Sequence, residues 1–201
     1  MHPYATDSEE RTWVPLLLAV ASIVSAWVLN LLLSTLEITV PWYIDAPSVV
    51  GFYSCFHVAF DRWAWRAPLL RRFGLLNIPD LRGSWAGEIA SCFDNYRTKR
   101  DATIRIRQTW TAIAVSLSTQ NSTSYSRIGA ILTESKVAPV LSYEYVNEPK
   151  ATAKETMHSH RGTAWPTLQS DNQTLSGEYY TGRDRQNFGI CKFERVQNKC
   201  G

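Results

Sequence analysis

With 201 residues and a formal net charge of +3, the chain has room for one or two domains. Its four cysteines lie far apart and form no CxxC pair, which excludes a disulfide framework and a zinc site built from clustered thiols. We interpret them as free thiols in a reducing compartment. Charge is distributed unevenly, because residues 13–60 are almost free of charged side chains whereas the remainder is polar and mixed in sign.

The first apolar run covers residues 13–36 and contains no charged side chain. A helix needs roughly 20 apolar residues to cross the hydrocarbon core, so this run predicts a transmembrane helix. The alternative is a cleaved signal peptide, whose apolar region is about 7–15 residues long and follows a basic start. Here the run is longer, and Asp7, Glu9 and Glu10 precede it.

A second, weaker span is expected at residues 42–60, although it contains Asp45 and His57. Tryptophan and tyrosine at both ends, at 42–43 and 63–65, are typical of the membrane interface. The linker at 37–45 lacks Lys and Arg, whereas four arginines follow the second span between residues 62 and 72. By the positive-inside rule, both termini are predicted to face the cytosol.

Small residues on the first helix point to helix packing. Ser22 and Ala26 lie four positions apart, and Asn30 follows one turn later. Such small faces let helices approach closely, and a buried Asn can hydrogen-bond across them. The same pattern is also common in membrane helices that do not associate specifically.

The hydrophobic pattern changes to a period of two after Pro79. Eight strands are predicted, at about 82–91, 101–109, 111–118, 123–133, 139–147, 160–167, 174–182 and 187–196. Eight is the number of strands whose closed barrel leaves room for side chains or one small ligand. The predicted fold is therefore two N-terminal transmembrane helices, residues 1–72, followed by a compact up-and-down, lipocalin-like β-barrel, residues 73–201.

Strand alternation, combined with up-and-down order, places the inward side chains at one of the two barrel ends. An apolar end is expected from Trp85, Trp110, Ile113, Leu132, Leu141, Trp165, Leu175 and Phe193. A polar and aromatic bowl is expected from Ser122, Ser124, Tyr143, Tyr145, Arg161, Thr163, Tyr179, Thr181 and Arg183. In the sixth strand alternation is ambiguous, and Arg161, Thr163 and Trp165 share one face of it.

The loops expected around the bowl carry Arg97, Lys99, Arg100, Lys150, Lys154 and Arg185. Arginine makes bidentate contacts to phosphate oxygens, and tyrosines stack on bases. This combination suits a phosphorylated ligand with stackable rings; alternatively, the basic loops only keep the domain soluble.

Local motifs add little chemistry. Gly83-Ser84-Trp85 is similar to the G-x-W of lipocalin first strands, where the tryptophan closes one barrel end. His158 and His160 lack a third ligand at recognisable spacing, and zinc sites need three or four, so no metal is expected. No P-loop, G-x-S-x-G or H-E-x-x-H occurs, and no enzymatic activity is predicted.

The order of segments resembles a known family. Two N-terminal spans are followed by Asp80-Leu81-Arg82-Gly83-Ser84-Trp85, Gln108-Thr109-Trp110, Ser122-Thr123-Ser124, Tyr143-Glu144-Tyr145, His160-Arg161-Gly162-Thr163-Ala164 and Leu175-Ser176-Gly177-Glu178-Tyr179-Tyr180-Thr181-Gly182-Arg183. This arrangement resembles the two-transmembrane, β-barrel effectors associated with bacterial CD-NTase enzymes in CBASS anti-phage defence.

The resemblance implies a function. In that family a CD-NTase answers infection by making a cyclic nucleotide, the barrel senses it, and the effector associates in the inner membrane and damages it. The cell then dies before the phage matures. Carried over to this chain, the resemblance implies a cyclic dinucleotide ligand contacted by Arg161, Thr163, Tyr179, Thr181 and Arg183, homo-oligomerisation on activation, no cofactor, and no DNA or RNA partner.

Three other functions stay open, of which the simplest is structural anchoring of a partner. A membrane-tethered, lipocalin-like carrier would hold a small apolar ligand, but the inward Ser122, Ser124, Thr181 and Arg183 disfavour an apolar bowl. A membrane phosphodiesterase would use His160 and Arg183 on a cyclic dinucleotide.

Overall fold

The computed structural model describes residues 1–38, 42–133, 138–153, 158–182 and 186–196. The chain forms two compact units. One unit is helical and comprises Glu9–Asn77, and the other is the β-barrel, which comprises Met1–Ser8 and Ile78–Gly201. The helical unit is thus inserted into the barrel unit after its eighth residue, which the boundary expected between residues 72 and 73 did not anticipate.

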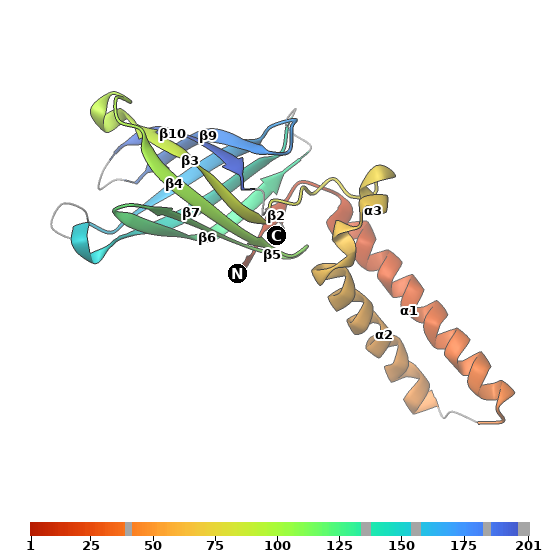
Figure 1. Cartoon of the computed structure of the whole chain (residues 1–201). Helices are drawn as coiled ribbons and strands as arrows, with labels where there is room; N and C mark the ends of the chain where they lie inside the picture. Colours follow the sequence, from red (N-terminus) through yellow and green to blue (C-terminus); the bar gives the residue numbers. More distant parts are fainter. Residues whose placement is uncertain (39–41, 134–137, 154–157, 183–185, 197–201) are drawn as a thin grey trace, which may run out of the picture. The chain divides into compact units, whose positions relative to one another are not determined.

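The helical unit consists of two long helices and two short ones. Helix α1 spans Glu10–Thr35 and α2 spans Trp42–Arg62, followed by η1 at Ala64–Arg66 and α3 at Pro68–Arg72. Figure 1 shows α1 and α2 running antiparallel, and the two helices pack against each other. Ser22 and Ala26 are buried within this unit, so the small-residue pair of α1 serves packing inside the chain. Large apolar side chains such as Leu16 and Trp27 are exposed on α1, as a lipid-facing surface requires.

The prediction of two spanning helices needs a correction. Both helices form, but within the described part of the chain α1 alone is long and apolar enough to cross a membrane. The reason lies in composition, because α2 includes Asp45, His57 and Asp61 among its 21 residues. These residues interrupt the apolar stretch that a span requires.

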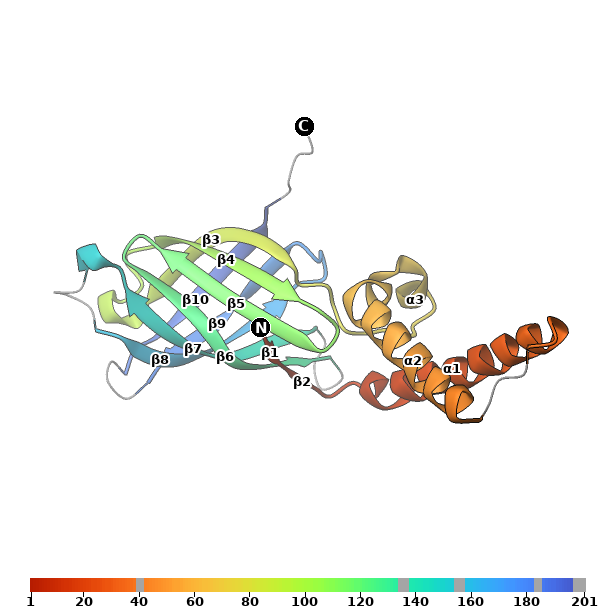
Figure 2. The ribbon, with the colours of Figure 1, turned by 90° about the horizontal axis from the view of Figure 1, so that it is seen from below.

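The barrel is a closed, antiparallel, up-and-down sheet (Figures 1 and 2). Its eight strands are β3 (Gly83–Ser91), β4 (Arg100–Gln108), β5 (Ala112–Thr119), β6 (Ser122–Leu132), β7 (Val140–Pro149), β8 (His160–Leu168), β9 (Thr174–Thr181) and β10 (Phe188–Arg195). Each strand pairs with the next, and β10 closes the barrel by pairing with β3. Short 3-10 helices follow β3 at Cys92–Asp94 and β7 at Ala151–Ala153. The eight predicted strands and the lipocalin-like topology are therefore confirmed.

Two short N-terminal strands, which the sequence did not predict, complete the sheet. Strand β1 (His2–Pro3) pairs antiparallel with β5, and β2 (Ala5–Thr6) pairs parallel with β6. The first residues of the chain thus lie between β5 and β6, as Figure 2 shows for β1 and β2.

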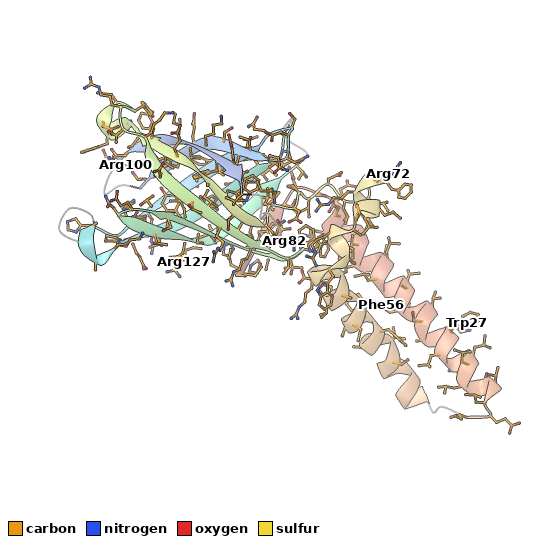
Figure 3. The ribbon with its side chains drawn as sticks, viewed as in Figure 1. Trp27, Phe56, Arg72, Arg82, Arg100 and Arg127 are labelled. Atoms are coloured by element: carbon orange, nitrogen blue, oxygen red, sulfur yellow. The ribbon has the colours of Figure 1, made fainter. Side chains whose placement is uncertain are left out.

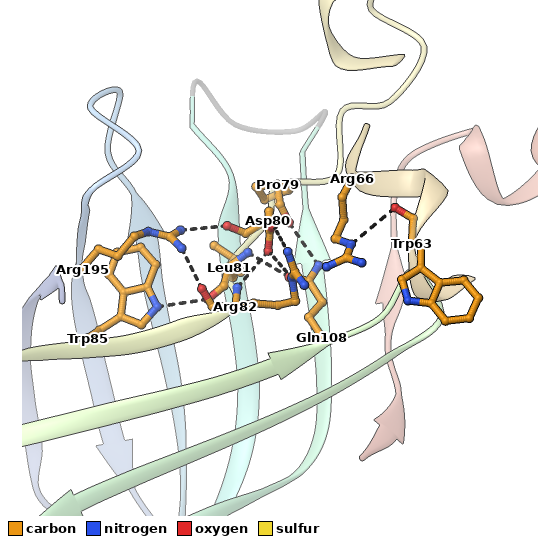
Figure 4. Close-up of polar contacts among 9 residues, drawn as sticks. All are labelled: Trp63, Arg66, Pro79, Asp80, Leu81, Arg82, Trp85, Gln108 and Arg195. Atoms are coloured by element: carbon orange, nitrogen blue, oxygen red, sulfur yellow. Dashed lines mark hydrogen bonds and ion pairs between the residues drawn. The ribbon is translucent and has the colours of Figure 1, made fainter. Parts of the chain in front are cut away.

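One barrel end is closed by an apolar cluster. Trp85, Trp110, Ile113, Leu141, Leu175 and Phe193 are all buried, as expected. Figure 4 shows how Trp85 is held: its indole N–H donates to the Leu81 carbonyl at 3.0 Å, and the Arg195 guanidinium lies 4.2 Å from the ring centroid. Arg195 also donates to the carbonyl oxygens of Arg82 and Asp80 and so connects the end of β10 to the segment that leads into β3. Desolvation on burial lowers the pKa of the Arg195 guanidinium, which nonetheless stays protonated.

Two residues assigned to this closed end do not belong to it. The register of β6 shifts at a bulge between Ser126 and Ile128, which moves Ile131 into the core and leaves Leu132 only partly buried. Trp165 is 43% exposed, because β8 turns its even-numbered residues inward. A one-residue change of phase moves every following side chain to the other face.

Candidate ligand-binding cavity

The barrel contains a cavity of about 600 Å³. It lies where β3 ends and β4 begins, at the end opposite to Trp85; Arg82 and Arg100 mark the two ends in Figure 3. Tyrosine, hydroxyl, amide and imidazole side chains share the wall with a few apolar ones, and Phe193 of the apolar cluster contributes to it. A volume of this size falls within the range of small-molecule sites, about 300–1,000 Å³.

Tyrosines form the deeper part of the wall. The strand register places Tyr143, Ala164, Tyr179 and Gly189 in one row across β7, β8, β9 and β10. Tyr145 lies on the same face of β7 as Tyr143, with the two ring centroids 6.1 Å apart and the planes tilted by 52°. These rings present aromatic surface and phenol groups to the same space.

The phenols of Tyr143 and Tyr179 stay protonated at neutral pH. Burial raises the pKa of Tyr143 above its ordinary value, and burial raises that of Tyr179 as well. The hydroxyls of Tyr145 and Tyr179 contact the carbonyls of Tyr180 and Ala90 at 3.5 and 3.4 Å, which are long distances for hydrogen bonds. Both hydroxyls lie in the cavity wall, where a ligand acceptor can approach them.

Glycines position two of these rings. Gly162 lies opposite Tyr145 in the ladder, and a Cβ atom there would lie 2.4 Å from the Tyr145 ring atoms. Gly189 lies opposite Tyr179, and a Cβ atom there would also lie 2.4 Å from that ring. The absent side chains leave room for each tyrosine to lie across the neighbouring strand.

A polar row lies closer to the mouth. Ser124, Asn147 and His160 face one another across β6, β7 and β8, and all three are buried. The His160 Nδ1–H donates to the His158 carbonyl at 3.1 Å, which orients the ring. Amide and imidazole groups in one row can read the hydrogen-bonding edge of a base.

The other hydroxyls in the wall have structural partners. Thr181 Oγ1 donates to the Asn187 carbonyl and accepts from the Asn187 N–H, both at 2.9 Å. Ser122 Oγ lies 3.2 Å from Thr119 Oγ1 across the β5–β6 turn. Both residues line the cavity, but their hydroxyls hold the loops at its mouth.

Positive charge at the mouth is partly neutralised. Arg100 extends the inward face of β4 and forms a long ion pair of 3.8 Å with Asp94. Lys99 forms an ion pair with Glu88, and Lys150 Nζ donates to the Thr119 carbonyl. Arg97 is exposed. Of the expected basic rim, Lys99 and Arg100 line the cavity, whereas Lys154 and Arg185 lie outside the described residues.

The family assignment rests on two matches to family models. Residues 76–195 match the family described as "Cap15, cyclic dinucleotide receptor domain", and residues 12–66 match "Cap15, TM helices". The chain belongs to the Cap15 family. The resemblance drawn from its motifs is thereby confirmed, and the two matched regions correspond to the barrel and to the two long helices.

Curated relatives agree with this membership in the Cap15 family. A protein of Yersinia aleksiciae named CD-NTase-associated protein 15 is 28% identical over 151 residues, which are 75% of this chain and 71% of that protein. A protein of the same name from Staphylococcus schleiferi is 27% identical over 143 residues, covering 71% and 75% of the two chains.

Within this Cap15 barrel, six of the nine predicted site residues line the cavity: Ser122, Ser124, Tyr143, Tyr145, Tyr179 and Thr181. Arg161 and Thr163 were placed on the wrong face of β8, where they point outward. Arg183 lies outside the described residues.

Asn147 and His160 were missed by the sequence reasoning. Asn147 simply continues the alternation of Leu141, Tyr143 and Tyr145 and could have been found from it. His160 was considered as a metal ligand or a catalytic residue rather than as part of the wall. Within the described chain, no group of three or more His, Cys, Asp or Glu side chains could hold a metal ion.

Proposed function

We propose that the barrel is the sensor of a cyclic dinucleotide and that the chain is a membrane-anchored effector of CBASS anti-phage defence. The observation that carries the proposal is the cavity, where tyrosine rings, a polar row and Arg100 converge at one barrel end. A cyclic dinucleotide presents the matching chemistry, with two flat bases and two anionic phosphates.

The proposed contacts follow from the three parts of the cavity wall: the deeper tyrosines, the polar row and the mouth. Tyr143, Tyr145 and Tyr179 provide stacking surface, and stacking on an aromatic ring contributes roughly 1–3 kcal/mol per base. Asn147 and His160 are placed to bind base edges. Arg100, with its weak ion pair to Asp94, can turn its guanidinium to a phosphate.

The effector role comes with the family. We propose that a CD-NTase supplies the ligand, that binding promotes homo-oligomerisation, and that the helices then disrupt the bacterial inner membrane and cause abortive cell death. In this arrangement α2 crosses the bilayer together with α1 despite its polar residues, because residues 1–8 and the strands that follow α2 belong to one barrel unit and so lie on one side of the membrane. The arginines at 62–72 place that side, with both termini and the barrel, in the cytosol. This function requires no bond-breaking step and no DNA or RNA.

Calorimetric titration of the full chain in detergent tests the proposal. The full chain is needed because Met1–Ser8 are part of the barrel unit. A panel of 3′,3′-cyclic dinucleotides built from A, G and U, with cyclic trinucleotides, is titrated. Micromolar or tighter binding of one member supports a nucleotide sensor, whereas no heat from the folded protein across the whole panel would refute it.

The two rival functions predict different results. A lipocalin-like carrier would release a lipid on extraction with organic solvent, and a phosphodiesterase would turn over the cyclic dinucleotide, which chromatography detects. The polar row of Ser124, Asn147 and His160 disfavours the first, because a wall of amide, hydroxyl and imidazole groups matches a polar ligand better than an apolar one.

A further inference from the structure

The barrel wall has one weakly closed place, between β5 and β6, which we call the β5–β6 seam. The two strands are registered over three residue pairs only, from Ser116–Tyr125 to Ser118–Thr123. The neighbouring β6–β7 ladder extends over the whole of β6, from Ser122 to Leu132. Beyond Ser116–Tyr125, on the side away from the turn, β5 and β6 separate and pair with the N-terminus instead.

Residues 1–8, which we call the N-terminal strap, fill this gap. His2 and Pro3 pair with Ile113 and Ala112 of β5, and Ala5 and Thr6 pair with Ala130 and Ile131 of β6. Side chains add to these backbone pairs. Tyr4 is buried and donates its hydroxyl to the Trp110 carbonyl at 2.8 Å, and Asp7 accepts from the Thr133 N–H at 2.7 Å.

The strap and the β5–β6 ladder compete for the same strand edges. Continuing the observed register would pair Val115 with Ser126 and would run on into the edges that the strap occupies. Where β5 and β6 separate, the Ser126 hydroxyl accepts a hydrogen bond from the Val115 N–H at 2.9 Å and lies 2.8 Å from His2 Nε2. A longer ladder would displace the strap, and a seated strap keeps the ladder short.

The seam connects the cavity with the membrane helix. Leu117 and Ser124, which form the middle registered pair, line the cavity, as do Thr119 and Ser122 at the adjoining turn. At the other end, Ser8 is the last residue of the strap in the barrel unit and Glu9 is the N-cap of α1. No linker intervenes between the strap and the transmembrane helix.

We propose that the strap is the element that passes ligand binding to α1. A ligand that holds β5 and β6 together at the cavity extends their ladder, expels residues 1–8 and frees the start of α1. This inference rests on the proposed function, because it requires a ligand in the cavity, and it adds the route by which the signal leaves the barrel.

A disulfide lock tests the route. Ala5→Cys with Ala130→Cys ties the strap to β6 at registered positions. The control ties the same β6 position to β7 instead, as Ala130→Cys with Ser142→Cys, also registered. Each full chain is reconstituted in dye-loaded vesicles, oxidised, checked for the bond by mass spectrometry, and exposed to the cyclic dinucleotide panel. Calorimetry measures binding in parallel.

The strap-locked protein is expected to bind the ligand more weakly than its reduced form, because a ligand that favours the expelled strap loses that preference when the strap cannot leave. At saturating ligand it is expected to release dye at least tenfold less, with release restored by dithiothreitol. The control lock is expected to release dye as the wild type does. Release from the strap-locked protein at the wild-type rate would refute the route. If no panel member binds the wild-type protein, the proposed function fails instead.

Hydrogen exchange gives a result that does not depend on any ligand. The peptide covering residues 1–8 is expected to exchange at least tenfold faster than the peptide covering β7, because a strand held at two pairs on each side opens locally. Equal protection of the two peptides would refute an exchangeable strap.

Discussion

Arg100→Ala is the sharpest test of the cavity, because Arg100 lies at its mouth and contributes little to the fold. It begins β4 on the face that continues into Ala102 and Ile104, so its side chain belongs to the inner surface. Its ion pair with Asp94 spans 3.8 Å and is half exposed. Such pairs contribute about 0–1 kcal/mol, so the barrel is expected to stay folded.

The expected loss of affinity follows from the phosphate contact that we propose for Arg100. Hydrogen bonds to charged groups contribute about 1.5–3 kcal/mol, which corresponds to a rise in Kd of about 10- to 150-fold. Arg100→Lys keeps the charge but loses the bidentate geometry, and an intermediate Kd is expected.

Calorimetry of the full chain measures the three Kd values against the cyclic dinucleotide that binds the wild type. Arg105→Ala is the matched control, because Arg105 is on the same strand but points outward. Thermal unfolding verifies that each variant folds. If Arg100→Ala binds the ligand as tightly as Arg105→Ala does, the reasoning that places a phosphate at the mouth of the cavity is wrong.

Further predictions concern the wall. Gly162→Ala brings a Cβ within 2.4 Å of both the Tyr145 side chain and the Tyr180 carbonyl oxygen, so it should displace the ring and strain the β8–β9 ladder; calorimetry should show at least tenfold weaker binding and thermal unfolding a lower Tm, and wild-type values of both would contradict this packing. Asn147→Ala should change the ranking of bases across the panel more than it changes overall affinity, and a uniform loss would contradict base reading. Burial raises the pKa of Cys191 to about 11, so maleimide labelling at pH 8 should be about 200-fold slower than for an ordinary thiol and should accelerate as the pH rises toward 11; fast labelling at pH 8 would contradict this burial. Arg183→Ala should abolish cyclic dinucleotide binding, which the same titration measures.

The barrel could be predicted because its signal is local. In β4, β5, β7, β9 and β10, apolar or aromatic side chains and glycines recur at every second position, and the predicted inner faces agree with the alternation of burial. Loops are short, so the order of strands followed from up-and-down connection. These two properties of the sequence are sufficient to place Tyr143, Tyr145 and Tyr179 in one space.

Strand β8 shows where alternation fails. Its inward residues include His160, Gly162 and Pro166, whereas its outward residues include Arg161 and Trp165. Neither face is consistently apolar, because the inward face forms part of a polar cavity and a glycine makes room for Tyr145. Alternating apolar residues identify the buried face of a strand only where that face packs into an apolar core. In β8 the buried face lines a polar cavity instead, which explains why Arg161 and Thr163 were predicted to point inward.

The N-terminal strap was beyond sequence reasoning for a different reason. Its strands are two residues each, too short for any period to appear, and their partners lie more than 100 residues away. The gap that they fill exists only because the bulge in β6 and the short β5–β6 ladder leave strand edges unpaired. Unpaired edges bind strands, and here the segment that binds them continues directly into α1. In the route that we propose, a barrel with a complete ladder would have no edge through which ligand binding could act on that helix.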